Sequence, residues 1–220
     1  PISARTVPRH TVCRCASAWM SGAGAPPGPA PDGVPPQPPR CEVTPFSQAH
    51  GPGAAHVWAS GLAQTAESSP RWLRPLMRHL MMRLEAHALS PSGDIGPEGA
   101  NWQEHWQGDG RRMFVACDPC SGEVIGCCCV KRGTKEGRDP EPDSKACSVW
   151  RVSVDERFRR RGVGDALMDA AEQWAREQQA ETMCLVTGNS FAARFYERRG
   201  YRKLGWTEAL GPWYSKPLAG

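Results

Sequence analysis

The chain has 220 residues, with 27 Lys and Arg against 23 Asp and Glu, for a net charge of +4. This length allows one substantial domain plus tails, and the mild charge, concentrated in local arginine clusters, gives little support for nucleic-acid binding. No stretch approaches the roughly 20 uncharged apolar residues of a membrane helix, because the most apolar candidate, residues 73–89, contains three arginines and a glutamate; no transmembrane span is expected.

Ten cysteines in this length raise the question of a disulfide scaffold. Cys127, Cys128 and Cys129 are consecutive, and neighbours on a strand point to opposite faces, so the three cannot all form disulfides. The pattern favours a reducing compartment, and we expect a cytoplasmic protein. Cys117 and Cys120 form a C-x-x-C pair in an expected hairpin turn. Because no second such pair lies close by, we expect no metal site there.

Residues 1–39 are rich in Pro, Gly, Ala and Ser, and they include the tract PPGPAPDGVPPQPP. Such a composition cannot form a packed core, so we expect a disordered tail followed by a single folded domain over residues 40–220. Arg5, Arg9 and Arg14 precede the first acidic residue, Asp32. This charge distribution is also compatible with an organelle transit peptide, although an ordinary disordered tail is the favoured interpretation.

The predicted elements begin at residues 40–45, a short alternating stretch that ends in proline and indicates an edge strand. A weak helix is expected over residues 54–63. Apolar residues then recur at helical spacing from residue 70 onward, and Pro75 suits the first turn of that helix. This stripe predicts a helix that faces the core, which we favour over one that lies on a membrane surface. The stripe consists of Leu73, Leu76, Met77, Leu80 and Leu84.

The middle of the chain predicts a hairpin. A turn-rich stretch and a short helix over residues 100–106 come first. Two apolar runs, at residues 112–116 and 123–130, are then joined by a short segment with Pro and Gly, which is typical of two antiparallel strands. Residues 131–145 are charged and lack an apolar period, so they predict a solvated loop.

A strand over residues 149–154 leads through a basic glycine turn into an amphipathic helix that runs to about residue 179. Residues 182–187 form a short apolar run that indicates a buried strand. Strand, helix and strand in this order imply a right-handed crossover and local parallel pairing.

The end of the chain predicts one more helix and two closing strands. Asn189 is suited to cap the helix, and Gly200 is suited to end it. The closing strands are expected at residues 201–204 and 213–217.

The basic turn has the composition of an anion site. Gly162 and Gly164 allow backbone N–H groups to approach a ligand closely, and the start of a helix favours negative charge. Arg159, Arg160 and Arg161 add fixed positive charge. The turn therefore suits a phosphate or a pyrophosphate.

Two motifs carry a family resemblance. The turn reads R-x-x-G-x-G, and the later segment reads NSFAARFYERRGY. Together they resemble the GCN5-related N-acetyltransferases, whose acetyl-CoA turn reads Q/R-x-x-G-x-G/A and whose next motif reads approximately N-x-x-A-x-x-x-Y-x-x-x-G-F. The resemblance implies a mixed α/β fold, with a strongly twisted central sheet flanked by helices, and an acetyl-CoA-dependent N-acetyltransferase that needs no metal. GDI at residues 93–95 and RVSVDERFR at residues 151–159 look like the camello-type branch. That branch usually carries a membrane segment before the catalytic core, where this chain has the arginine-containing residues 73–89.

The resemblance also implies the roles of individual residues. Tyr196 would protonate the departing CoA thiolate, and a backbone N–H of residues 152–154 would stabilise the oxyanion formed when a primary amine of a small molecule or peptide attacks the thioester directly. Asn189 would line the cofactor cleft. The predicted cofactor-binding residues are Val152, Ser153, Val154, Arg159, Arg160, Arg161, Gly162, Val163, Gly164 and Asn189.

Several alternatives stay open at this point. The general base is not assigned: Glu123, Asp155, Glu156 and a water-mediated route are all compatible with the sequence. Tyr196 can instead be a core aromatic residue of its helix. The whole domain can also be a catalytically silent acetyltransferase-like module that binds CoA or a protein partner.

Overall fold

A seven-stranded sheet organises the protein. The computed structural model describes residues 41–67, 69–134, 145–207 and 211–218, all within one unit, Pro39–Gly220. The strand order is β1-β2-β3-β4-β5-β7-β6, in which β4 and β5 pair in parallel and the other neighbouring strands pair antiparallel. The strands are β1 Glu42–Pro45, β2 Arg111–Cys117, β3 Val124–Arg132, β4 Ala146–Val154, β5 Thr182–Val186, β6 Arg202–Thr207 and β7 Gly211–Pro217.

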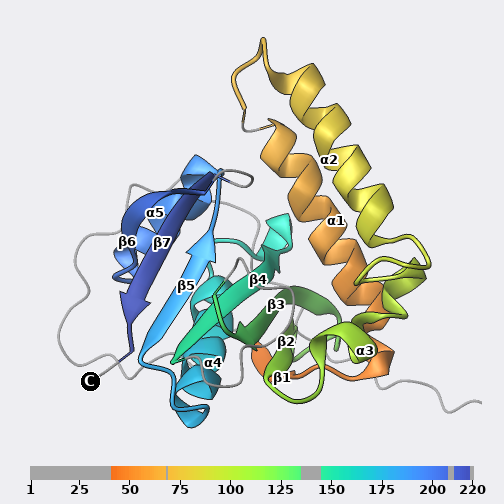
Figure 1. Cartoon of the computed structure of the whole chain (residues 1–220). Helices are drawn as coiled ribbons and strands as arrows, with labels where there is room; N and C mark the ends of the chain where they lie inside the picture. Colours follow the sequence, from red (N-terminus) through yellow and green to blue (C-terminus); the bar gives the residue numbers. More distant parts are fainter. Residues whose placement is uncertain (1–40, 68, 135–144, 208–210, 219–220) are drawn as a thin grey trace, which may run out of the picture. The chain divides into compact units, whose positions relative to one another are not determined.

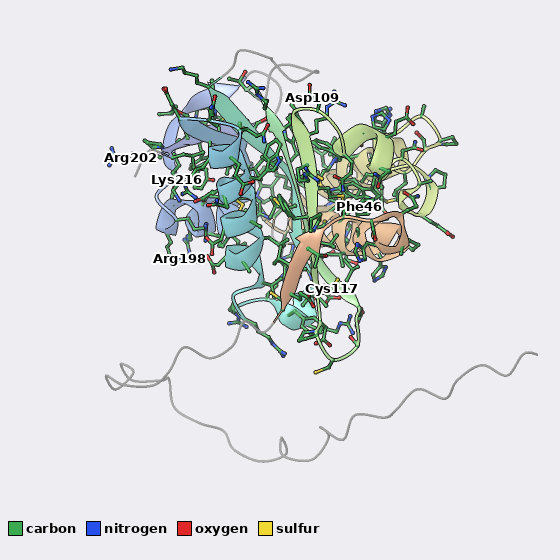
Figure 2. All side chains as sticks on the ribbon, turned by 90° about the horizontal axis from the view of Figure 1, so that it is seen from below. Phe46, Asp109, Cys117, Arg198, Arg202 and Lys216 are labelled. Atoms are coloured by element: carbon green, nitrogen blue, oxygen red, sulfur yellow. The ribbon has the colours of Figure 1, made fainter. Side chains whose placement is uncertain are left out.

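Helices cover both faces of this sheet, as Figure 1 shows. Figure 2, at right angles to that view, places Phe46 on the side of α1 and both Arg198 and Lys216 on the side of α4 and α5. The mixed α/β fold with a sheet flanked by helices confirms the predicted fold class. The helices are α1 Gly51–Glu67, α2 Arg74–Ala88, α3 Trp102–Trp106, α4 Val163–Glu177 and α5 Ser190–Arg198.

The central strand β3 is buried along almost its whole length because helices cover both of its faces. Cys128 faces the core on the α4 side, whereas Cys127 and Cys129 face the core on the α1 side. The thiols described by the structure are free, so these cysteines serve as small apolar core residues. The predicted loop at residues 131–145 begins too early, because β3 continues to Arg132 and Lys131 is buried; residues 135–144 lie outside the described part of the chain.

The helix after the basic turn packs as its apolar period predicts. Val163, Leu167 and Ala171 of α4 are fully buried against the sheet. Glu172, a charged residue of the same helix, is also buried, since only 3% of it is exposed. Its carboxylate accepts hydrogen bonds from Arg199, Lys216 and the Tyr201 hydroxyl, which is how a buried charge is kept paired.

The prediction that α2 turns its apolar stripe to the core is wrong. Leu76 is 62% exposed and Leu80 is 46% exposed, and only Met81 and Ala88 of the helix are buried. The reason is the layering: α1 covers the sheet, and α2 packs on α1 as a second layer, so Leu76, Leu80 and Leu84 lie on an exposed face of α2 (Figure 1). In the described ranges, no helix has both the length and the apolar character to cross a membrane.

The remaining elements match the expected order. β1 is an edge strand, α1 is longer than predicted, and the hairpin of β2 and β3, the helix α5 and the closing strands β6 and β7 are confirmed. The tail expected at residues 1–39 lies outside the described residues, so its disorder stays a prediction.

Candidate active site

The site is formed where two parallel strands separate. β4 and β5 pair from Ala146 with Thr182 to Ser148 with Cys184. Beyond that point β4 continues to Val154 along β3, while β5 continues along β7. The two strands therefore diverge at their carboxyl ends, and Figure 1 shows this separation. Openings at the carboxyl ends of parallel strands are where α/β proteins bind ligands.

A bulge accompanies the divergence. Cys127 pairs with Ser153 and Cys129 with Trp150, so two residues of β4, Arg151 and Val152, lie opposite the single residue Cys128. Arg151 has a left-handed backbone with φ of +52°. An extra residue of this kind bends a strand and changes the direction of the groups that follow it.

Backbone amides of β4 face the opening. The N–H of Asp155 donates to Ile125 of β3. Because alternate residues of a strand direct their N–H groups to opposite sides, the N–H groups of Val152 and Val154 point to the side from which β5 has diverged. The side chain of Ser153 does not serve the opening, since its hydroxyl donates to the carbonyl of Val57 in α1 at 2.9 Å.

The basic turn supplies further amides. Arg160 (φ +57°) and Gly162 (φ +84°) are both left-handed, which curves the backbone into a concave turn of the sort that binds anions through its N–H groups. Gly162 caps α4 without any side-chain hydrogen bond, and a Cβ at this position would meet no atom within 4 Å. The amides of the first turn of α4 are therefore approachable. Val163 contributes only its backbone here, because its side chain is in the core.

The charged side chains around the turn leave it with an excess of positive charge. The three predicted arginines are exposed; Arg159 donates to the carbonyl of Val154, and Arg161 lies over the Phe158 ring. Asp165 is the one acidic residue in the first turn of α4, and its carboxylate is paired with Arg199 at 2.9 Å. This pairing offsets the repulsion that Asp165 would exert on an anion.

Asn189 has two structural contacts beside the opening. Its Oδ1 accepts from the N–H groups of Phe191 and Ala192, which caps α5 as predicted. Its Nδ2 donates to Thr65 Oγ1 near the end of α1 at 3.3 Å. The residue therefore ties α1 to the segment that follows β5.

Tyr196 is 6% exposed and packs against Tyr201, with ring centroids 5.7 Å apart. Burial raises the pKa of its phenol, and the neighbouring Cys128 acts in the same direction. The phenol is therefore protonated at neutral pH, as an acid must be, although the burial equally suits a core residue. The next residue on α5, Phe195, lies close to the basic turn, because a Cβ at Gly164 would be 3.4 Å from its ring.

Two of the three candidate bases are engaged by one arginine. Arg157 forms ion pairs with Glu123 at 2.6 Å and with Asp155 at 2.8 Å. Hydrogen bonding to Arg157 lowers the pKa of Asp155, which makes it a weaker base. Glu156 accepts a hydrogen bond from Gln64 of α1. Among the described residues, no group of three or more His, Cys, Asp or Glu has the arrangement of a metal site.

Sequence reasoning missed Arg151 and its partner Asp94. Both fall within the short segments that resemble the camello-type branch, yet neither was given a role. The charge pair is long-range, and a left-handed backbone at a non-glycine residue leaves no signal in the sequence.

Comparison with known proteins decides the family. The model of the Acetyltransferase (GNAT) family matches residues 79–201, which is more than half of the chain and includes both motifs. The chain belongs to the GNAT family of acetyltransferases. The family match agrees with the resemblance predicted from the two motifs.

Curated relatives match over a part of their length. The chain is 31% identical over 94 residues to an uncharacterized N-acetyltransferase of Chlorobaculum tepidum, covering 43% of this chain and 52% of that protein. It is 32% identical over 84 residues to the uncharacterized protein YdhI of Bacillus subtilis, covering 37% of this chain and 45% of that protein. The chain thus spans about half the length of these relatives.

Solved structures share the fold. A GNAT-family acetyltransferase of Staphylococcus aureus superposes with a TM-score of 0.56 at 13% identity, covering 81% of this chain and 99% of that one. The PaiA N-acetyltransferase of Thermoplasma acidophilum, solved with coenzyme A, superposes with a TM-score of 0.54 at 12% identity, covering 80% and 98%. At these identities the likeness establishes the GNAT fold.

Proposed function

We propose that this GNAT protein is an acetyl-CoA-dependent N-acetyltransferase that acetylates a primary amine of a small molecule or peptide. The observation that carries the proposal is the separation of β4 from β5 directly before the left-handed turn at the start of α4. Backbone donors that suit a thioester carbonyl and a pyrophosphate along one continuous segment support the proposal.

The residues fit the two ends of such a ligand. The amides of Gly162, Val163 and Gly164, with the exposed Arg159 and Arg161, suit the pyrophosphate. Acetyl-CoA would supply an activated acetyl group for transfer.

The chain itself supplies orientation and polarisation at the other end. In the proposed mechanism, the N–H groups of Val152 and Val154 donate to the acetyl oxygen, where negative charge develops during attack by a neutral amine. Tyr196 is the proposed proton donor to the departing sulfur. Asn189 is proposed to hold α1 next to the start of α5, on one side of the opening. Holding both reactants in one opening replaces a bimolecular encounter by an oriented one.

Binding of acetyl-CoA tests the proposal. At about 100 times its Kd, a ligand stabilises the folded state by about 2.7 kcal/mol, which raises the Tm of a domain of this size by about 5–10 °C. Gly162→Val should remove this shift, because the added side chain enters the open space over the turn. Gly122→Val is the matched control, since Gly122 is also left-handed with open space around its Cβ but lies in the β2–β3 turn.

A wild-type protein whose Tm is unchanged by both acetyl-CoA and CoA would refute the proposal. A loss of the shift in Gly122→Val as well would mean that the effect of Gly162→Val is a general consequence of backbone strain. Membership of the camello-type branch is a separate proposal, which rests on the short segments that include GDI and RVSVDERFR.

A further inference from the structure

The bulge in β4 depends on an unusual backbone at Arg151. Its φ of +52° lies in the left-handed region, which is strained for a residue with a side chain but not for glycine. Such a conformation persists only where surrounding contacts hold it.

The Arg151 side chain is fixed by a two-point ion pair. Its Nη2 donates to Asp94 Oδ1 at 2.7 Å and its Nε donates to Asp94 Oδ2 at 3.1 Å. The two side chains are only 25% and 23% exposed, so the pair is screened less than one on the open surface. The guanidinium also lies 4.6 Å from the ring centroid of Trp58 in α1, a distance that allows a cation–π interaction.

Asp94 is itself held in place. The indole N–H of Trp106 donates to Asp94 Oδ2 at 3.0 Å, and the Trp106 ring packs against Trp150, the β4 residue before Arg151. From the other side, the thiol of Cys127 donates to the Arg151 carbonyl at 3.3 Å. Residue 151 is therefore fixed through its side chain and its backbone by α1, α3, β3 and the loop that carries Asp94.

We infer that Asp94, Arg151 and Trp58 are positioning residues that hold the β4 bulge in the one conformation in which the Val152 N–H faces the acetyl group. The inference rests on the proposed function. The physical reason is that the register of a strand determines the side to which each of its groups points. If the bulge were lost, the pairing of β4 with β3 would shift by one residue, and the N–H groups and side chains that follow would point to the opposite side. None of the three side chains needs to touch the ligand.

The test compares two substitutions at one position. Arg151→Ala removes the contacts of the guanidinium with Asp94 and Trp58 but keeps the strain of a left-handed backbone at a residue with a side chain. Arg151→Gly removes both the contacts and the strain, because glycine adopts this conformation freely. Isothermal titration of the full chain gives the Kd for acetyl-CoA and the Kd for CoA. The difference between the two reports on the contact with the acetyl group.

Arg151→Ala should raise the Kd for acetyl-CoA about tenfold, as expected when one hydrogen bond to the ligand is lost. The Kd for CoA should change by no more than about twofold. Arg151→Gly should keep most of the preference for acetyl-CoA. Asp94→Ala should behave as Arg151→Ala does, and the double variant Asp94→Ala, Arg151→Ala should be no worse than either alone, because both remove the same interaction.

Asp94→Asn keeps a side chain of the same size and serves as the milder variant if an alanine variant does not fold. Lys145→Ala is the matched control, because it removes an ion pair with Glu181 that is exposed and lies at the start of β4; both affinities should be unchanged. Equal weakening of acetyl-CoA and CoA, or an Arg151→Gly variant as impaired as Arg151→Ala, would overturn the inference. Wild-type protein that binds neither ligand would instead refute the proposed function, and this inference with it.

Discussion

The side chains of β4 next to the opening pack on both faces of the sheet: Arg151 and Ser153 reach α1, whereas Val152 and Val154 pack against the core on the α4 side. The backbone is what faces the proposed ligand. Arg151 reaches Asp94 and Trp58, and Ser153 donates to α1. The chemistry assigned to this strand therefore belongs to amides, whose positions side-chain substitutions change only indirectly. This is why a motif of apolar residues can specify the site.

At the residue scale, the predicted helix cap is confirmed, because Asn189 caps α5. Gly162 has a left-handed backbone, which glycine adopts freely, and its role in binding the cofactor stays a prediction. The engagement of Glu123 and Asp155 by Arg157 was not predictable, because it joins side chains that come together only in the folded chain.

Tyr196→Phe tests the proposed acid. The phenyl ring preserves packing against Tyr201, so acetyl-CoA binding and Tm should be nearly unchanged, while kcat should fall about 100-fold, as for the loss of a general acid. Steady-state thiol release measures kcat, and titration measures Kd. Because burial raises the pKa of this phenol, wild-type kcat should show no loss of an acid form from Tyr196 below about pH 10.

An equal loss of affinity and kcat in the phenylalanine variant would mean that Tyr196 acts only in the core. Tyr214→Phe is a control on another buried tyrosine, one that lies on β7, and it should leave kcat unchanged.

At the scale of elements, the apolar period predicted α4 and the strands well because their partners lie within the same domain. The same reasoning failed for α2. Periodicity shows which side of a helix is apolar, but it does not show whether another layer covers that side. In α2 the side chains of Leu76, Leu80 and Leu84 are exposed, whereas Met81 and Ala88 are buried.

Substitution of the α2 stripe tests this arrangement. Leu76→Gln and Leu80→Gln should each change the free energy of unfolding by no more than about 0.5 kcal/mol, as for exposed positions. Leu167→Ala, on the buried face of α4, should cost about 2–5 kcal/mol. Denaturant titrations followed by circular dichroism give these values. A cost above about 2 kcal/mol for either α2 variant would show that the stripe is buried.

At the scale of the whole domain, one buried carboxylate joins the elements on the α4 side. Glu172 of α4 is bonded to Arg199 after α5, to Tyr201 before β6 and to Lys216 of β7. A buried network of this kind fixes the relative positions of helices and strands only while each member has a partner.

Glu172→Gln should therefore destabilise the fold by about 3 kcal/mol, because it leaves Arg199 and Lys216 with reduced charge compensation in a buried site. Glu177→Gln, on the exposed end of the same helix, is the control and should be nearly neutral. Thermal and denaturant unfolding measure both. A neutral Glu172→Gln would show that solvent or other groups compensate the two cations.

The central claim, acetyl transfer to a primary amine, is tested most directly by release of free CoA thiol from acetyl-CoA in the presence of an amine panel. The panel should cover amino acids, polyamines, cysteine conjugates and basic peptides. We expect acceptor-dependent thiol release by the wild-type protein, with a matching acetylated amine by mass spectrometry and a strong reduction in Tyr196→Phe. Saturable binding of acetyl-CoA without thiol release for any acceptor would contradict the claim and identify the domain as a silent CoA-binding module.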